Sequence, residues 1–164
     1  MYSSSNEFDL TIVPIRYLFH LDMEVESRIN GKSVANSIAA ISTKIFHDDT
    51  KWISSMSKEL RGSNLLLLGW NDETPKSVNV SCSLDCVVVV MIWERDGRQD
   101  ILTDILQNQG WTLKNDLQVS WETIGDAKGK TKSVLSSRVS ASQIFEFNTP
   151  DNALPISIFV VQGE

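Results

Sequence analysis

The feature that most constrains the fold of this chain is a long extended stretch from Ser77 to Trp93. In its first half, alternate residues share one apolar face, which comprises Val78, Val80, Cys82, Leu84 and Cys86. From Val87 onward both faces are apolar, so we expect this end of the stretch to be covered by other elements on both sides. Asp85 interrupts the alternation and is expected to mark a bulge.

Alternation predicts further strands elsewhere in the chain. Between Tyr17 and Glu26 five apolar residues alternate with polar ones, which indicates a strand with one buried and one wet face. Shorter apolar runs predict strands over 65–68, 144–147 and 156–161, and a hairpin of 111–113 with 117–121 around a turn at 114–116.

Apolar residues at helical spacing predict about three helices. The first covers residues 33–47, with Ser33 as its N-cap, and the second covers 51–60 and ends at Gly62. The third begins near Asp100, because acidic residues there suit the helix dipole, and stops at Gly110. Together with the strands, these helices predict an α+β fold with a mixed, mostly antiparallel sheet.

The length of 164 residues, with 41% hydrophobic and 22% charged residues, is typical of a single globular domain. Residues 1–14 are predicted to form an N-terminal arm, in which Phe8, Leu10 and Ile12 alternate with polar residues until Pro14. Residues 15–164 form the predicted domain. Within it, residues 125–142 are rich in Gly, Lys and Ser and are predicted to be a flexible basic loop.

The formal net charge of −6 disfavours attraction of the whole chain to nucleic acid or anionic lipid, so such binding would need a local basic patch. Residues 126–138 provide the one such segment, with a net charge of +3. Its candidate binding residues for nucleocapsid or lipid are Lys128, Lys130, Lys132, Val134, Leu135 and Arg138. The alternative is an ordinary solvated loop.

The two cysteines, Cys82 and Cys86, are predicted to be reduced thiols of a cytosolic protein. On one extended strand they would lie roughly 13 Å apart, which is beyond the reach of a disulfide. The sequence contains no signal peptide and no apolar run of the length of a membrane span.

Catalytic and cofactor motifs are absent from the sequence, including the nucleophile elbow, the P-loop and the dinucleotide fingerprint. His47, Asp48 and Asp49 lack the spacing of metal ligands, so no metal site is predicted. Asp22, Glu24 and Glu26 share a strand face, where they either keep that face wet or serve acid–base chemistry. We predict no catalytic residue, no cofactor and no small-molecule substrate.

The order of the predicted elements resembles the globular domain of rhabdovirus matrix proteins over residues 17–122. The resemblance rests on an alternating strand at 19–27, the following helix, the run Leu65–Gly69, the apolar stretch Val87–Trp93 with its acidic turn, and the segment Gly110–Lys114. The N-terminus is short and acidic, with Glu7 and Asp9, and lacks the basic, proline-rich tail of animal-virus members. A plant- or insect-infecting relative fits better. Residues 125–164 have no counterpart in this comparison.

This resemblance implies a viral matrix protein that polymerises, binds and condenses the nucleoprotein–RNA complex and links it to the envelope, through anionic membrane or the tail of an envelope glycoprotein. The implied location is the virion, between nucleocapsid and envelope, and the host cytoplasm, in association with membranes. Self-association would use Phe8, Leu10 and Ile12 in the N-terminal arm. A second hypothesis is a small adaptor or inhibitor, such as an immunity protein or viral suppressor, that forms a stoichiometric complex with a basic protein through its acidic strand face. A third is a hydrolase or nuclease that uses the same carboxylates with a divalent ion.

Overall fold

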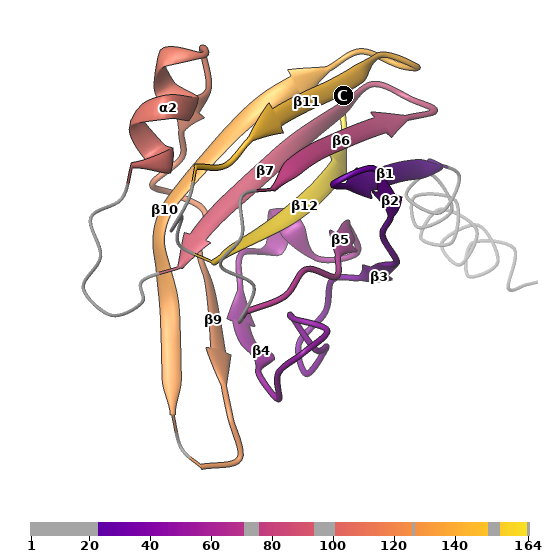
Figure 1. The fold of residues 1–164 in the computed structure, drawn as a ribbon. Helices are drawn as coiled ribbons and strands as arrows, with labels where there is room; N and C mark the ends of the chain where they lie inside the picture. Colours follow the sequence, from indigo (N-terminus) through magenta and orange to yellow (C-terminus); the bar gives the residue numbers. More distant parts are fainter. Residues whose placement is uncertain (1–22, 71–75, 94–100, 126, 151–154, 164) are drawn as a thin grey trace, which may run out of the picture.

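The computed structural model describes residues 23–70, 76–93, 101–125, 127–150 and 155–163 (Figure 1). The predicted arm at 1–14, including Phe8, Leu10 and Ile12, lies outside the described residues, as do His20 and Asp22. The strands in chain order are β1 (Val25–Ile29), β2 (Lys32–Ser33), β3 (Asn36–Ile38), β4 (Trp52–Met56), β5 (Asn64–Leu66), β6 (Ser77–Cys82), β7 (Cys86–Trp93), β8 (Thr112–Leu113), β9 (Val119–Glu122), β10 (Lys128–Val139), β11 (Ile144–Asn148) and β12 (Ile156–Gln162). The helical elements are the 3-10 turn η1 (Lys58–Leu60) and the α-helix α2 (Leu102–Asn108).

The strands form two sheets in which every pairing between named strands is antiparallel. A four-stranded sheet has the order β11-β6-β1-β2. An eight-stranded sheet has the order β3-β5-β12-β7-β10-β9-β4, and β8 pairs with β10 beside this path. Figure 1 shows the β9–β10 hairpin extending past the ends of the other strands.

One core lies between the two sheets. The inward residues of β6, which are Val78, Val80 and Cys82, pack against one face of β7 and β12, and Leu102 and Leu106 of α2 extend this core. The buried pattern of β6 alternates strictly, so its other face remains partly exposed. This is the alternation that the sequence predicts for a strand with one buried face.

A second core lies on the opposite face of the eight-stranded sheet. It joins Val89, Met91 and Trp93 of β7 to Ile53 of β4 and Trp121 of β9. Side chains on the two faces of β7 contribute to the two cores. The prediction that other elements cover this strand on both sides is therefore confirmed.

The predicted α+β class with about three helices is wrong, since α2 is the one α-helix among the described residues. Residues 33–47 contain β3 and no helix, because β3 pairs with β5. Ile38 and Ile41, which were to face the core on one helix side, are 42% and 43% exposed. Residues 51–60 form β4 and η1, because pairing of β4 with β9 places Ile53 and Met56 in the second core.

The predicted loop at 125–142 is also replaced by ordered structure. Its central part is β10, a strand of 12 residues. Most of this strand pairs with β7, and its first residues pair with β9. A polar sequence is held as a strand here because its neighbours supply the hydrogen-bond ladder and the apolar cover. The predicted hairpin of 111–113 with 117–121 is wrong for the same reason, since β8 and β9 each pair with β10.

Other sequence predictions are confirmed. The helix near 100–110 is α2, and Gly110 follows it with a φ of +92°, a conformation that favours glycine. The strands predicted at 65–68, 144–147 and 156–161 correspond to β5, β11 and β12. The element order behind the rhabdovirus resemblance included a helix after the first strand, and this helix is replaced by β2 and β3.

Candidate ligand-binding hollow

A hollow with a volume of about 450 Å³ opens on the second-core side of the eight-stranded sheet. Its floor is formed by Val87 and Val89 of β7, and its wall by β8, β10 and the segment that follows β8. The full lining is Val87, Val89, Gly110, Thr112, Lys114, Leu117, Ser136, Ser137 and Arg138. A volume of this size is in the range of sites for small ligands or short segments of chain.

The strand register explains why polar side chains meet an apolar floor here. Ser136 of β10 lies opposite Thr112 of β8 on one side and Val89 of β7 on the other. Directly opposed residues of antiparallel strands point to the same face, so these three side chains form one cross-strand row. Arg138, opposite Val87, begins the next row along β10.

Lys114 occupies the row on the other side of Ser136. Its backbone N–H donates to the carbonyl oxygen of Val134 at 2.7 Å, which continues the β8–β10 register by one residue. Val134 and Arg138 are four residues apart on β10, which corresponds to roughly 13 Å of strand. Lys114 and Arg138 therefore stand at opposite ends of the hollow, with hydroxyl groups between them.

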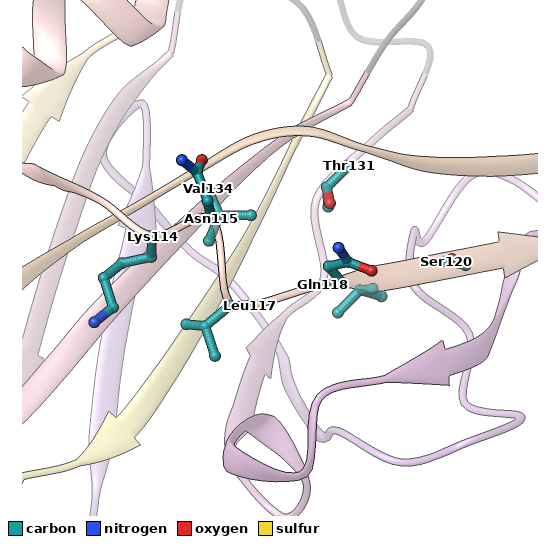
Figure 2. A pocket seen from close by; sticks show the side chains of 8 residues that line it. Lys114, Asn115, Leu117, Gln118, Ser120, Thr131 and Val134 are labelled. Carbon is teal, nitrogen blue, oxygen red and sulfur yellow. The ribbon is translucent and has the colours of Figure 1, made fainter.

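A second hollow of about 240 Å³ adjoins the first, and Lys114 and Leu117 line both. It lies between the β8–β9 connection and β10, where Gln118, Ser120 and Thr131 provide polar groups (Figure 2). In Figure 2, Lys114 lies on the opposite side of this hollow from Gln118 and Thr131. Because the two hollows share these lining residues, we refer to them together as the track along β10.

The charges of this track have one sign. Among the described lining residues of the two hollows, Lys114 and Arg138 are ionisable, both are cationic, and none is acidic. Arg138 is exposed and Lys114 is half-buried. The track can thus offer two positive charges, hydroxyl groups and side-chain amides to an anionic ligand.

The structure separates the six residues predicted to contact nucleocapsid or lipid. All six lie on β10, but Val134 and Leu135 are buried and belong to the second and the first core respectively. They are unavailable as an exposed apolar pair, because the two faces of β10 are covered at this point. Arg138 contributes to the hollow.

The remaining lysines lie at the other end of β10. Lys128 is exposed and its Nζ is 3.7 Å from Oε1 of Glu122 on β9. Lys130 lies opposite Ser120, and Lys132 lies at an irregularity of the β10–β7 register between Thr131 and Ser133. Lys128 and Arg138 therefore lie near opposite ends of a strand of 12 residues.

The two carboxylates weighed for metal binding beside His47 have other contacts. Asp49 pairs with Lys51, and Asp48 accepts a hydrogen bond from the backbone N–H of Trp70. In the described parts of the chain, no group of three or more His, Cys, Asp and Glu residues could hold a metal ion. Glu26 lies on β1 and Glu24 immediately precedes this strand, and both side chains are exposed.

A buried cation lies in the second core, close to the hairpin. Lys51 is 8% exposed, and its Nζ lies 4.2 Å from the ring centre of Trp70, 4.8 Å from that of Trp121 and 2.5 Å from Oδ2 of Asp49. Trp121 fits over Gly129 on β10, where a Cβ atom would lie 2.2 Å from the indole. This cluster fastens β4 and β9 to β10 and has a structural role.

Sequence reasoning missed Lys114, Thr112 and Ser136. Lys114 was assigned to a hairpin turn and Ser136 to a loop. The alternation of Val134, Ser136 and Arg138 against Leu135, Ser137 and Val139 is the period of a strand, and it could have indicated that Arg138 shares a face with hydroxyl groups.

Comparisons with known proteins show a fold relationship only. No family model and no curated protein matches the sequence. Among solved structures, a GH138 enzyme targeting pectin rhamnogalacturonan II is similar, with a TM-score of 0.54, 15% sequence identity and coverage of 86% of this chain. The chain spans 16% of that enzyme. In the described parts of the chain, no helix has the length and apolar character needed to cross a membrane.

Proposed function

We propose that this protein is a binding module that holds an extended acidic peptide segment in the track along β8 and β10. The observation that carries this proposal is the placement of Lys114 and Arg138 at the two ends of a hydroxyl-lined hollow whose described lining contains no acidic side chain. A carboxylate gains a charge-assisted hydrogen bond from either cation.

The charge of the whole chain sets the range of this interaction. At a net charge of −6 the protein repels an acidic ligand at a distance, so attraction acts only within the hollow. The Debye length is about 8 Å at physiological ionic strength. Binding should therefore weaken as salt is added, because both cations are accessible to solvent.

The spacing of the cations favours a ligand in a strand conformation. Side chains on one face of an extended peptide repeat every two residues, or roughly 6.6 Å. The long side chains of Lys114 and Arg138 can converge on two carboxylates that are two to four residues apart. The hydroxyl groups of Thr112 and Ser136 and the amide of Gln118 would then hydrogen-bond to the ligand backbone.

The lining disfavours nucleic acid as the ligand. Single-stranded nucleic acids are held by aromatic side chains on which the bases stack. Neither hollow has an aromatic side chain among its described lining residues.

A second candidate function is the matrix-type assembly predicted from the sequence, with the chain's own N-terminal segment as the acidic occupant. In this segment Glu7 and Asp9 alternate with Phe8, Leu10 and Ile12. Its two carboxylates complement the two cations of a neighbouring copy, so the same track would link copies. Nucleocapsid and envelope binding stay predictions of the sequence.

The binding proposal is tested by titrating a fluorescent peptide of residues 5–14 into the full-length protein and measuring anisotropy at several salt concentrations. Lys114→Ala and Arg138→Ala should each weaken binding about tenfold at low salt. Lys32→Ala, an exposed lysine on β2, is the matched protein control and should have no effect. The matched peptide control carries Glu7→Gln and Asp9→Asn and should bind weakly to every variant.

Two further arms distinguish the candidate functions. If the peptide binds and light scattering shows that the double variant Lys114→Glu/Arg138→Glu or deletion of residues 1–14 dissociates oligomers, the assembly role is supported. If other acidic peptides bind while the protein stays monomeric, the binding module stands and the assembly role is rejected. If acidic peptides bind equally well to the wild type and the double variant, the track is not the site.

A further inference from the structure

The two cysteine residues lie together at the bend that joins the two sheets. Cys82 ends β6 of the four-stranded sheet, and Cys86 begins β7 of the eight-stranded sheet. Both thiols are free, and the residues are 3% and 1% exposed in the first core. The sequence-based separation of roughly 13 Å assumed one straight strand, and this condition is not met, because Cys82 and Cys86 belong to strands of different sheets.

The bend between the cysteines is held by hydrogen bonds from three other segments. The carbonyl oxygen of Cys82 accepts from the N–H of Ser142 at 2.8 Å, and that of Asp85 accepts from the N–H of Gly163 at 2.7 Å. Ser83 exchanges two hydrogen bonds with Glu24. These contacts fix the ends of β6 and β7 relative to each other.

Cys82 and Cys86 both contribute buried side chains to the first core, from strands that are separated by only three residues. Hydrogen bonding with the Cys86 thiol lowers the pKa of the Cys82 thiol below its ordinary value, against the opposing effect of burial. The same hydrogen bond and burial raise the pKa of Cys86. The directions of these two shifts favour Cys82 over Cys86 as the thiol that ionises first.

The bend between the two buried cysteines is itself exposed. Ser83, Leu84 and Asp85 are all exposed, and Leu84 is exposed although it is apolar. The two cysteines flank these three residues in the sequence, and both belong to the first core. Local opening of three exposed residues is a smaller event than opening of the sandwich.

We propose that Cys82 and Cys86 form a peroxide-sensitive dithiol that closes to an intrachain disulfide linking the two sheets. The Cys82 thiolate attacks one oxygen of hydrogen peroxide, the O–O bond breaks, and the departing hydroxide takes a proton to become water. The Cys86 thiol then attacks the sulfur of the Cys82 sulfenic acid, the S–O bond breaks, and a second water leaves with the Cys86 proton. The two thiols lose two electrons, which reduce one peroxide to two waters.

The test treats the native full-length protein with a small excess of hydrogen peroxide and measures the intact mass before and after alkylation of free thiols. The wild type should lose the mass of two hydrogen atoms and both alkylation sites, and dithiothreitol should restore them. A few degrees' rise in Tm should accompany oxidation, because the disulfide constrains the unfolded chain.

Single variants separate the disulfide from other oxidation products. Cys86→Ser should gain oxygen at Cys82 without closing a disulfide, and Cys82→Ser should resist oxidation. Should either variant fold poorly, the wild-type mass still decides the question. Stepwise gain of oxygen atoms by the wild type, intermolecular crosslinks, or closure only after denaturation would each overturn the proposal.

Discussion

The two faces of the eight-stranded sheet are covered in different ways. The first face is covered by the four-stranded sheet and α2, and its core consists mainly of aliphatic residues, together with the two cysteines and the aromatic residues Trp111 and Phe147. The second face packs against β9 and β4, which are the last strands of the same sheet, and against the segments before and after β4. Its core is closed by a lysine between two indoles. Beyond this cover, Val87 and Val89 line an open hollow.

This difference teaches where function can arise in a sheet that is apolar on both sides. A face covered by a whole second sheet leaves no room for a ligand, because its apolar surface is used for folding. A face covered by two strands and loops has an unused end. At that end, polar side chains of β8 and β10 lie beside Val87 and Val89, and a bound ligand would bury these two apolar side chains.

Gly129→Ala should have the largest effect, because it disturbs the packing of Trp121 in the second core. A Cβ atom at this position would lie 2.2 to 2.4 Å from three atoms of the Trp121 indole, which Lys51 and Trp70 hold in place. We expect a loss of about 3 kcal/mol or more in the free energy of unfolding, measured by urea denaturation. Gly125→Ala in the same hairpin is the control, since its nearest neighbour is 4.0 Å away. Equal effects of the two variants would contradict the packing described for Trp121.

Leu135→Ala should show that β10 belongs to the first face as a core strand. Leu135 is fully buried, so its truncation should reduce the free energy of unfolding by about 3 kcal/mol. Its cross-strand partner Leu113 is 40% exposed, and Leu113→Ala should cost less than about 1 kcal/mol. A stable Leu135→Ala protein would restore the sequence-based interpretation of Leu135 as a surface contact residue.

Lys51→Met should sharpen the contrast between an aliphatic core and a core closed by a charge. The variant keeps an apolar stem between Trp70 and Trp121 but leaves Asp49 without its ion pair, and we expect a loss of about 2 kcal/mol. Adding Asp49→Asn should recover part of this loss in a double-mutant cycle. Full additivity of the two substitutions would mean that the Asp49–Lys51 ion pair contributes no interaction energy to the folded state.

Arg138→Ala should have the smallest effect on folding. The side chain is exposed at the open end of the second face, so the free energy of unfolding should change by less than about 0.5 kcal/mol. Tm measurement by circular dichroism provides the check. A large destabilisation would mean that Arg138 serves the cover of the sheet and is not available to a ligand.

The parts of the fold that could be predicted are those in which local pattern and environment agree. The apolar residues on both faces of β7 predict burial on both sides, and the alternation of β6 predicts burial on one side. The structure agrees with both predictions. The segments 33–47 and 51–60 carry apolar residues that fit a helix locally, but β5 and β9 offer them ladder partners distant in sequence. Such pairings override weak helix propensity and leave no local signal.

The candidate site was less predictable than the fold. Arg138 was predicted to bind an anionic partner, although within a basic loop, and Lys114 received no role. The two cations come from strands whose pairing joins residues 112–113 to 135–136, and neither strand is strongly apolar. Only the register brings them to one hollow, and the sequence alone does not specify that register.

The most direct test of the account is to map where an acidic extended peptide contacts the protein. ¹H–¹⁵N spectra of the labelled full-length protein, titrated with the peptide of residues 5–14, should show shifts at Thr112, Lys114, Ser136 and Arg138 that vanish with the Glu7→Gln/Asp9→Asn peptide. Shifts confined to Lys128 and the hairpin tip, or to the exposed face of β1, would contradict the claim that the open end of the second face is the binding site.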